Sequence, residues 1–403
     1  MEVNHILLGL LGRALFASQY TFDLQSAPWE ALFAECRAQS VELLVLDALT
    51  EEERGMIPKE TLSAWQFAAF RRLSKNEMLR HEQSVILKAL QEAKIPCVVL
   101  KGFTCSDNYP NPALRSAGDI DLLVGLPGVE RSRTVLETMG YKEAEEAHPY
   151  HLSLTKGSVV VELHHEPVGI PAGAAGQSLR QWFLGSEEQG TVRNGIPVLP
   201  KEQEAVLLLL HKLEHIMTSG LGLRQLCDWA VFVHRQMDET AWQTLKPHLE
   251  NFGLLYFAKV ITRICVGTLA LPQEAAPWCM DAEQAVCDAL LSDMLRTGNF
   301  GIKENRYGQR LFTDANSSNR LTSFWKVGVQ ACKDHWPICE KYPILLPVAP
   351  IYLLRRYDRQ RKEGLRPPLK LRAVYQGAQE RQKLYASLKP FAAKPTEKQK
   401  NES

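Results

Sequence analysis

Two aspartates separated by a single residue, Asp119 and Asp121, are the residues whose types and spacing point most directly to chemistry. Ile120 and the apolar run 122–124 are typical of a β-strand. Residues i and i+2 of a strand project from the same face, so the two carboxylates converge on one point. Two anions held that close need a cation, and oxygen ligands favour Mg²⁺ or Mn²⁺. We therefore expect Asp119 and Asp121 to bind a divalent metal.

A third acid, Glu162, lies in a later run with β-strand character, residues 158–164. If this strand pairs beside the Asp119 strand, Glu162 completes a cluster of three carboxylates. Such a cluster suits two-metal phosphoryl or nucleotidyl transfer, in which one metal activates a hydroxyl and the other neutralises a triphosphate. His164 and Glu166 share the face of Glu162, where either could act as a base or orient a ligand. We expect Asp119, Asp121 and Glu162 to be both metal ligands and catalytic residues.

Residues suited to binding phosphate precede the aspartates. Lys101 and Gly102 end a short β-rich run, residues 95–100. Glycine at a strand-to-helix turn lets backbone N–H groups approach a phosphate, so we expect a helix between Gly102 and Asp119. Lys101 and Arg115 would supply positive charge for a triphosphate. The predicted nucleotide-binding residues are Lys101, Gly102, Arg115 and His164.

The elements that must position these residues predict an α+β fold. A small mixed sheet carries the site, with a helix at 129–139 and a hairpin whose strands meet at Lys156 and Gly157. Helical periodicity precedes the sheet, including one long helix from Pro58 to Glu92, and follows it from Lys201 onward. Residues 167–199 are interpreted as a linking loop with one short helix near Trp182. The predicted units are an N-terminal helical region (1–93), the α/β domain (94–199), a helical bundle (200–340) and a basic C-terminal tail (341–403).

The charge distribution singles out the end of the chain. Residues 351–403 contain 14 Lys and Arg against 5 Asp and Glu, although the whole chain has a net charge of +1. Such a tail suits an anionic partner, or it is a solvated end. Aromatic and basic residues interleave in the run 353–362, as in a nucleic-acid or anionic-membrane contact. The alternative is a helix packed through Tyr352, Leu353 and Tyr357.

The cysteines and apolar segments predict a cytoplasmic protein. Nine cysteines occur without any C-x-x-C pair, which favours free thiols in a reducing compartment. The N-terminus lacks the basic region of a signal peptide. The longest apolar stretches, 205–210 and 344–354, are too short or too rich in proline to span a bilayer, so we expect no transmembrane segment.

Several of these motifs together resemble the bacterial "uncharacterised nucleotidyltransferase" family of the polymerase β-like superfamily. The resemblance covers roughly residues 90 to 240 and rests on segments 101–110, 114–115, 118–124, 161–165, 207–215 and 223–228. It implies a nucleotidyltransferase fold, with Asp119 and Asp121 as metal ligands and Glu162 as the third acid. The predicted activity is metal-dependent transfer of a nucleotidyl group from a nucleoside triphosphate to a hydroxyl-bearing acceptor. That acceptor could be a small molecule, a protein or a nucleic acid.

Other functions have some support in the sequence. Phe103 follows Gly102 where the wider superfamily usually has a small residue, often Ser or Gly, which favours a non-catalytic nucleotide-binding or assembly module. His211, Glu214 and His215 match the H-x-x-E-H signature of a zinc-dependent protease, and they share one helix face. These three residues could instead line the nucleotide or acceptor cleft. Arg224 and Asp228, four residues apart, are expected to form a structural ion pair.

Overall fold

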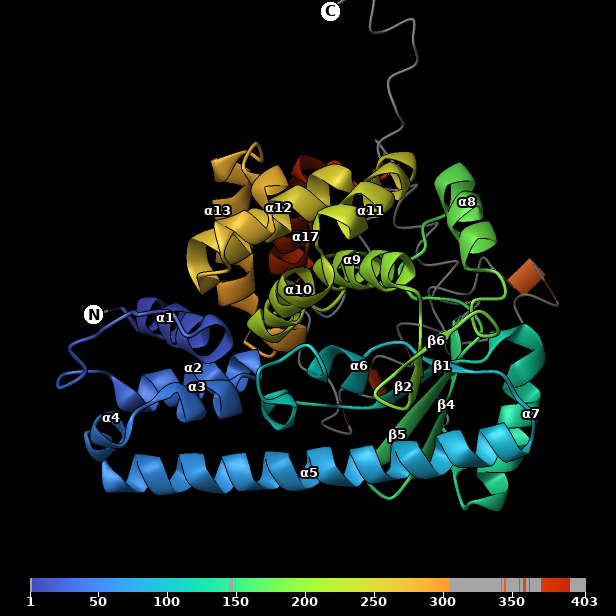
Figure 1. The fold of residues 1–403 in the computed structure, drawn as a ribbon, viewed down its shortest axis with the longest axis horizontal. Coiled ribbons are helices and arrows are strands. Elements are labelled where there is room, and N and C mark those ends of the chain that lie inside the picture. The colour runs from blue at the N-terminus through green and yellow to red at the C-terminus, as the bar shows by residue number, and fades with distance from the viewer. Residues whose placement is uncertain are drawn as a thin grey trace, which may run out of the picture.

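The computed structural model describes residues 2–144, 148, 150–303 and 371–391, with a few isolated positions between 342 and 362. Four helices come first: α1 (Val3–Phe16), α2 (Trp29–Gln39), α3 (Glu42–Ala48) and α4 (Glu51–Gly55). They are followed by α5 (Lys59–Glu92), which runs beneath both the N-terminal helices and the sheet (Figure 1). The long helix predicted from Pro58 to Glu92 is confirmed. It is continuous because no glycine or proline occurs within it.

A seven-stranded mixed sheet forms the centre of the α/β part. Its strands are β1 (Val98–Val99), β2 (Ile120–Leu123), β3 (Lys142–Glu143), β4 (His151–Lys156), β5 (Val159–His164), β6 (Thr191–Arg193) and β7 (Ile196–Val198). They lie in the order β3-β4-β5-β2-β1-β7-β6. The β4–β5 hairpin is confirmed, and β2 pairs in parallel with β5. The fold class, α+β with flanking helices, is therefore confirmed.

The alternation of residues along β2 separates the core from the site. Ile120 and Leu122 are buried in a cluster that joins the sheet to the second half of α5 and to α7 (Gly125–Thr138). Asp121 and Leu123 project from the opposite face, and Leu123 packs into the core shared with the helices. The strand thus turns its acidic side chains toward the helical layer.

Two of the seven strands lie in the segment 167–199, which the sequence indicated as a linking loop. The predicted short helix is present as α8 (Gly173–Phe183), but β6 and β7 follow it. β7 adds to the sheet in parallel beside β1. Three residues in each strand are too few for a detectable alternation, which is why the pattern did not reveal them.

The helical layer above the sheet contains α9 (Lys201–Met217), α10 (Leu223–Gln236), α11 (Glu239–Phe252), α12 (Leu255–Leu269) and α13 (Gln284–Thr297). Its buried residues form one hydrophobic core with those of α1, α2 and α3. α17 (Leu371–Ser387), in the segment predicted as a basic C-terminal tail, packs against α9 and α13. Ala378 and Leu388 are buried in this packing.

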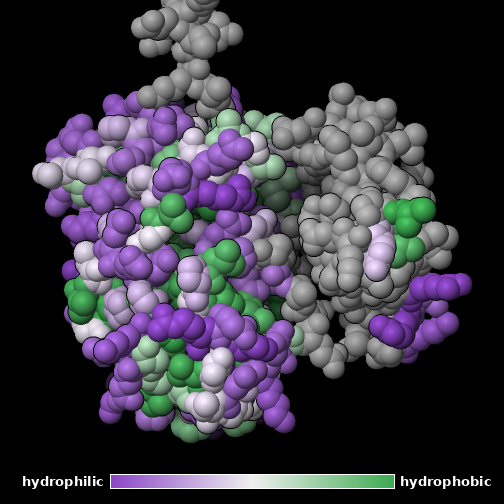
Figure 2. Space-filling model, turned by 90° about the vertical axis from the view of Figure 1, so that its right-hand side faces the viewer, coloured by the Kyte–Doolittle hydropathy of each residue, from purple (hydrophilic) through white to green (hydrophobic). Residues whose placement is uncertain are grey.

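The surface carries hydrophobic residues in small groups between hydrophilic ones on the face shown in Figure 2. None of the helices in the described ranges combines the length and the apolar content that membrane crossing requires. Seven cysteines lie in these ranges and all are free thiols. Cys332 and Cys339 lie outside the described residues. The run 353–362 also lies outside them, apart from a few isolated positions, so the anionic partner of the tail stays a prediction.

Candidate functional site

The three predicted carboxylates come together on adjacent strands. Asp119 directly precedes β2, and the parallel register of β2 and β5 places Asp121 opposite Glu162. One carboxylate oxygen from each of Asp119, Asp121 and Glu162 lies within 4.8 Å of the others. The strand pairing on which the prediction depended is therefore present.

Two basic side chains already contact this cluster. The Nζ of Lys101 lies 3.1 Å from Oδ1 of Asp121. His164, which is fully buried, places Nε2 3.1 Å from the same Oδ1 and 3.2 Å from Oε2 of Glu162. Burial lowers the pKa of His164, but its hydrogen bonds to Asp121 and Glu162 outweigh this effect and raise the pKa. His164 thus lies on the face expected of it and stabilises the ionised carboxylates.

Asp119 is the acid whose charge is least well compensated. The negative charge of Asp121, followed by burial, raises the pKa of Asp119. Burial also opposes ionisation of Glu162, but the hydrogen bond from His164 and the charge of Lys101 lower its pKa. Burial lowers the pKa of Lys101, but the charges of Asp121, Asp119 and Glu162 outweigh this effect and raise the pKa. One more positive charge near Asp119 would favour its ionised form and lower its pKa.

His151 joins this site from β4, and sequence reasoning did not identify it. Its Nε2 lies 3.5 Å from Oε1 of Glu162, and His151, Glu162 and His164 form a second group that could hold a metal ion. Burial, followed by the charges of His164 and His148, lowers the pKa of His151 to about 3. The tight turn after Lys156 fixes the hairpin register, so counting back from the turn would have placed His151 opposite His164.

The turn at Gly102 is present, and the helix expected after it is reduced to one short turn. Gly102 has φ +77°, a conformation that favours glycine. Only the four residues of α6 (Phe103–Ser106) follow, with a single 3₁₀ turn (Pro112–Leu114) before β2. Phe103 is buried in the sheet core and does not border the cavity described below. Its ring therefore leaves the site open, although no hydroxyl occupies this position.

Arg115 has a partner that the sequence did not indicate. Its Nε and Nη2 donate to the two oxygens of Asp228 on α10, at 2.9 and 2.8 Å. The hydroxyl of Tyr109 donates to the same carboxylate at 2.8 Å. Despite burial, the charge of Arg115 lowers the pKa of Asp228 to about 2. The predicted ion pair between Arg224 and Asp228 is therefore wrong, since a guanidinium from the loop before β2 engages both oxygens.

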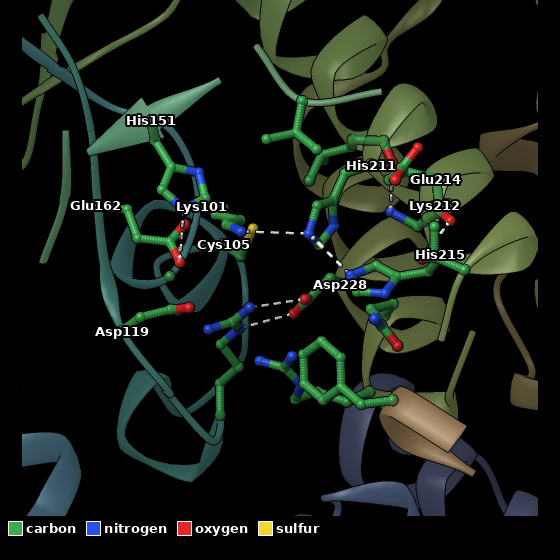
Figure 3. A pocket seen from close by; sticks show the side chains of 18 of the residues that line it. Lys101, Cys105, Asp119, His151, Glu162, His211, Lys212, Glu214, His215 and Asp228 are labelled. Atoms are coloured by element: carbon green, nitrogen blue, oxygen red, sulfur yellow. Dashed lines mark hydrogen bonds and ion pairs between the residues drawn. The ribbon is translucent and has the colours of Figure 1, made fainter. Parts of the chain in front are cut away.

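Asp119 and Glu162 border a cavity of about 270 Å³ whose opposite wall is made by α9 and α10, while Asp121 lies buried behind them (Figure 3). Lys101, Asp119 and Glu162 line it on one side, and His211, Lys212, Glu214, His215 and Arg224 line it on the other. The Nε2 of His211 lies 3.3 Å from Nζ of Lys101 and 3.0 Å from Nε2 of His215. The sheet side thus contributes the carboxylates of Asp119 and Glu162 together with Lys101 and Arg115. The helical side contributes the cations Lys212 and Arg224 together with Glu214 and Asp228.

The helical wall does not build the predicted zinc site. The groups in the described ranges that could hold a metal ion both lie on the sheet, and neither includes His211, Glu214 or His215. Burial, followed by the charge of Lys101, lowers the pKa of His215 to about 3. The histidines instead line the cavity, which was the alternative interpretation. Glu166 forms an ion pair with Arg180 at 2.7 Å and is not among the lining residues.

Comparison with known families agrees with this geometry. A family model described as "Uncharacterised nucleotidyltransferase" matches residues 25–269, which include the three carboxylates, the Gly102 turn and the wall formed by α9 and α10. No match was found among the curated proteins or the solved structures. The chain belongs to this nucleotidyltransferase family.

Proposed function

We propose that this protein transfers a nucleotidyl group from a nucleoside triphosphate to a hydroxyl-bearing acceptor, with Mg²⁺ or Mn²⁺ as cofactor. The observation that carries the proposal is the convergence of Asp119, Asp121 and Glu162 beside a cavity, in a chain of a nucleotidyltransferase family. Three carboxylates at one point are costly unless a ligand compensates them. The nature of the acceptor is left open.

The residues fit a divalent cation. Oδ2 of Asp121 is buried and has no hydrogen-bond partner, so one oxygen of the cluster is available for a ligand. The donor set consists of carboxylate oxygens, which suits Mg²⁺ or Mn²⁺. We assign Asp119, Asp121 and Glu162 as the metal ligands. When bound, the cation would neutralise phosphate charge and make the acceptor hydroxyl more acidic.

The protein's own side chains would accept the proton of the acceptor, orient Glu162 and contact the phosphates. The acceptor oxygen forms a bond to the α-phosphorus, the bond from that phosphorus to the bridging oxygen breaks, and pyrophosphate leaves. Glu162 would take the proton of the acceptor hydroxyl. His151 and His164 would orient its carboxylate from 3.5 and 3.2 Å. The Gly102 turn and Lys101 would contact the phosphates.

A non-catalytic nucleotide-binding module is the second candidate. The phenylalanine at position 103 offers no hydroxyl to a phosphate, which favours this alternative. It predicts metal-dependent nucleotide binding without release of pyrophosphate. Because the Phe103 ring is buried, it does not block the cavity, so steric obstruction gives no further support to the non-catalytic alternative.

Calorimetric titration of ATP, GTP, CTP and UTP, with and without Mg²⁺, tests the proposal. We expect Mg²⁺-dependent binding of at least one triphosphate, lost in Asp119→Ala/Asp121→Ala. Asp281→Ala is a suitable control, because Asp281 is an exposed carboxylate that pairs with Lys259 outside the cavity. Failure of every nucleotide to bind, or normal binding by the double variant, would contradict the site assignment. Pyrophosphate release with added acceptors then separates the enzyme from the binding module.

A further inference from the structure

Arg224 is a buried cation of the cavity wall that forms no direct ion pair with a carboxylate of the described residues, although the charges of Asp228 and Asp119 act on it from a distance. Its side chain makes a hydrogen bond from Nη1 to the backbone oxygen of Ser116 at 3.0 Å. Its Nε is buried without a partner, and within the described ranges no carboxylate forms an ion pair with it. Asp228, one helical turn away, is engaged through both oxygens by Arg115. Since an unpaired buried charge is unfavourable, the position of Arg224 requires an explanation.

A second cation lies in the same wall. Lys212 of α9 is 1% exposed, and its Nζ donates to the backbone oxygen of Leu208 at 3.2 Å. Burial lowers its pKa to about 8, so an anion that entered the cavity would favour the charged form. Lys212 and Arg224 both border the cavity, to which they contribute from neighbouring helices.

These two cations face the carboxylates from across the cavity. In Figure 3 Asp119 and Glu162 lie on the strand side, and Lys212 lies on the helix side. The charge of Arg224 is close enough to act on Asp119, where it opposes the rise in pKa. The face of Phe300 supports the guanidinium, whose Cζ lies 5.5 Å from the ring centroid.

The other cations of the site are already paired. Lys101 contacts Asp121 at 3.1 Å, and Arg115 contacts Asp228. A polyanion held at the carboxylates through a metal would extend across the cavity and would need positive charge at its far end. Guanidinium and ammonium groups provide it through charge-assisted hydrogen bonds to phosphate oxygens.

We propose that Arg224 and Lys212 form an anion subsite that binds the terminal phosphates of the nucleoside triphosphate. The inference rests on the proposed function and deepens it, because it moves the guanidinium that contacts phosphate from Arg115 to Arg224. A phosphate group carried by the acceptor has the same chemistry, so the test must separate these two sources.

Calorimetry on the full-length protein can do so with inorganic triphosphate, with the nucleoside triphosphate that binds best and with its monophosphate. Arg224→Gln keeps a polar side chain but removes the charge, and Arg224→Lys retains the charge without the planar group. Arg13→Gln is the matched control, since Arg13 is a partly buried arginine that pairs with Glu53 at 2.7 Å, outside the cavity. Thermal unfolding of each variant checks that it is folded.

We expect Arg224→Gln to weaken binding of the nucleoside triphosphate and of inorganic triphosphate roughly 10- to 100-fold, the loss expected for one charge-assisted contact. Monophosphate affinity should change by less than about threefold, and Arg224→Lys should recover part of the loss. Unchanged triphosphate affinity in a folded Arg224→Gln would overturn the proposal and would point to a phosphate on the acceptor.

The proposed function can fail separately. If the wild type binds no nucleotide but binds inorganic triphosphate without Mg²⁺, and Arg224→Gln abolishes that binding, the anion subsite stands and the nucleotidyltransferase assignment does not. If metal-dependent nucleotide binding is identical in the wild type and Arg224→Gln, the nucleotide site stands and the anion subsite does not. An equal loss in Arg13→Gln would also contradict the subsite, because it would indicate a general effect of removing an arginine.

Discussion

The negative charge of Asp119 is disfavoured by the fold itself, because Asp121 and burial both raise the pKa of its carboxyl. A folded-state pKa above the ordinary value of an acid means that ionisation destabilises the protein at neutral pH. We therefore expect Asp119→Asn to melt at the same temperature as the wild type or higher when no metal is present. With Mg²⁺ the order should reverse, since only the wild type gains stability from binding. Differential scanning calorimetry with and without Mg²⁺ measures both, and a metal-free variant that melts well below the wild type would contradict this account.

Gly102 contributes through its backbone conformation. A Cβ added here would lie 3.7 Å from the backbone oxygen of Asp119, which is an ordinary contact distance, so space permits alanine while the φ of +77° does not favour it. We expect Gly102→Ala to destabilise the protein by about 1–2 kcal/mol and to weaken nucleotide binding, because Lys101 would move with the turn. Urea unfolding and calorimetry check the two effects. Gly157→Ala is the control, since φ is +59° and the turn lies outside the cavity. It should lose stability but keep nucleotide affinity.

At the scale of elements, the ion pair between Arg115 and Asp228 joins the loop before β2 to α10. Asp228→Asn would leave Arg115 buried without its counter-charge, so we expect a loss of about 3–5 kcal/mol in the free energy of unfolding at pH 7. The pKa of Asp228 is lowered to about 2, below the roughly 3.9 of an unfolded chain. The stabilisation is therefore complete above about pH 4 and is lost as the pH falls toward 2. Urea unfolding across this range should show the two proteins converging in acid, and a constant difference would contradict the prediction.

Arg224, one turn before Asp228 in α10, should differ from Arg115 in its effect on stability. Burial, followed by the charge of Arg115, lowers the pKa of Arg224, so its charge opposes folding. We expect Arg224→Gln to stay within about 1 kcal/mol of the wild-type stability or to exceed it, while Arg115→Gln loses about 3–5 kcal/mol. Chemical denaturation of the two variants compares them directly. A severe loss in Arg224→Gln would indicate a structural arginine.

How far the sequence predicted these elements depended on the length of each pattern. Long helices such as α5 and the β4–β5 hairpin carry enough periodic residues to be identified, and the i, i+2 spacing of Asp119 and Asp121 needs only one strand. The three-residue strands β6 and β7 carry no such pattern. The partner of Asp228 was missed for another reason. Two arginines could reach it, one of them 113 residues away in sequence, and only tertiary packing decides between them.

At the scale of the whole molecule, the cavity lies where the sheet meets a helical layer drawn from both ends of the chain. Helices α1 to α3 share one core with α9 to α13, while the sheet packs on α5 and α7. The carboxylates and the cations that face them thus belong to different layers. Within the described ranges, Asp119 on the sheet side and Arg224 on the helical side form no ion pair, and the proposed substrate would bind between them.

α17 is the last described element of the helical layer, and it packs against α9, which forms part of the helical wall of the cavity. The Nη1 of Arg381 donates to the backbone oxygens of Met217 and Thr218, at 3.1 and 2.8 Å, which satisfies carbonyls at the end of α9. We expect deletion of residues 371–403 to lower the melting temperature and to weaken triphosphate binding, because α9 also carries His211 and Lys212. Arg381→Met separates the hydrogen bonds from the packing of α17. If the deletion variant bound nucleotide normally, the position of the helical wall would not depend on α17.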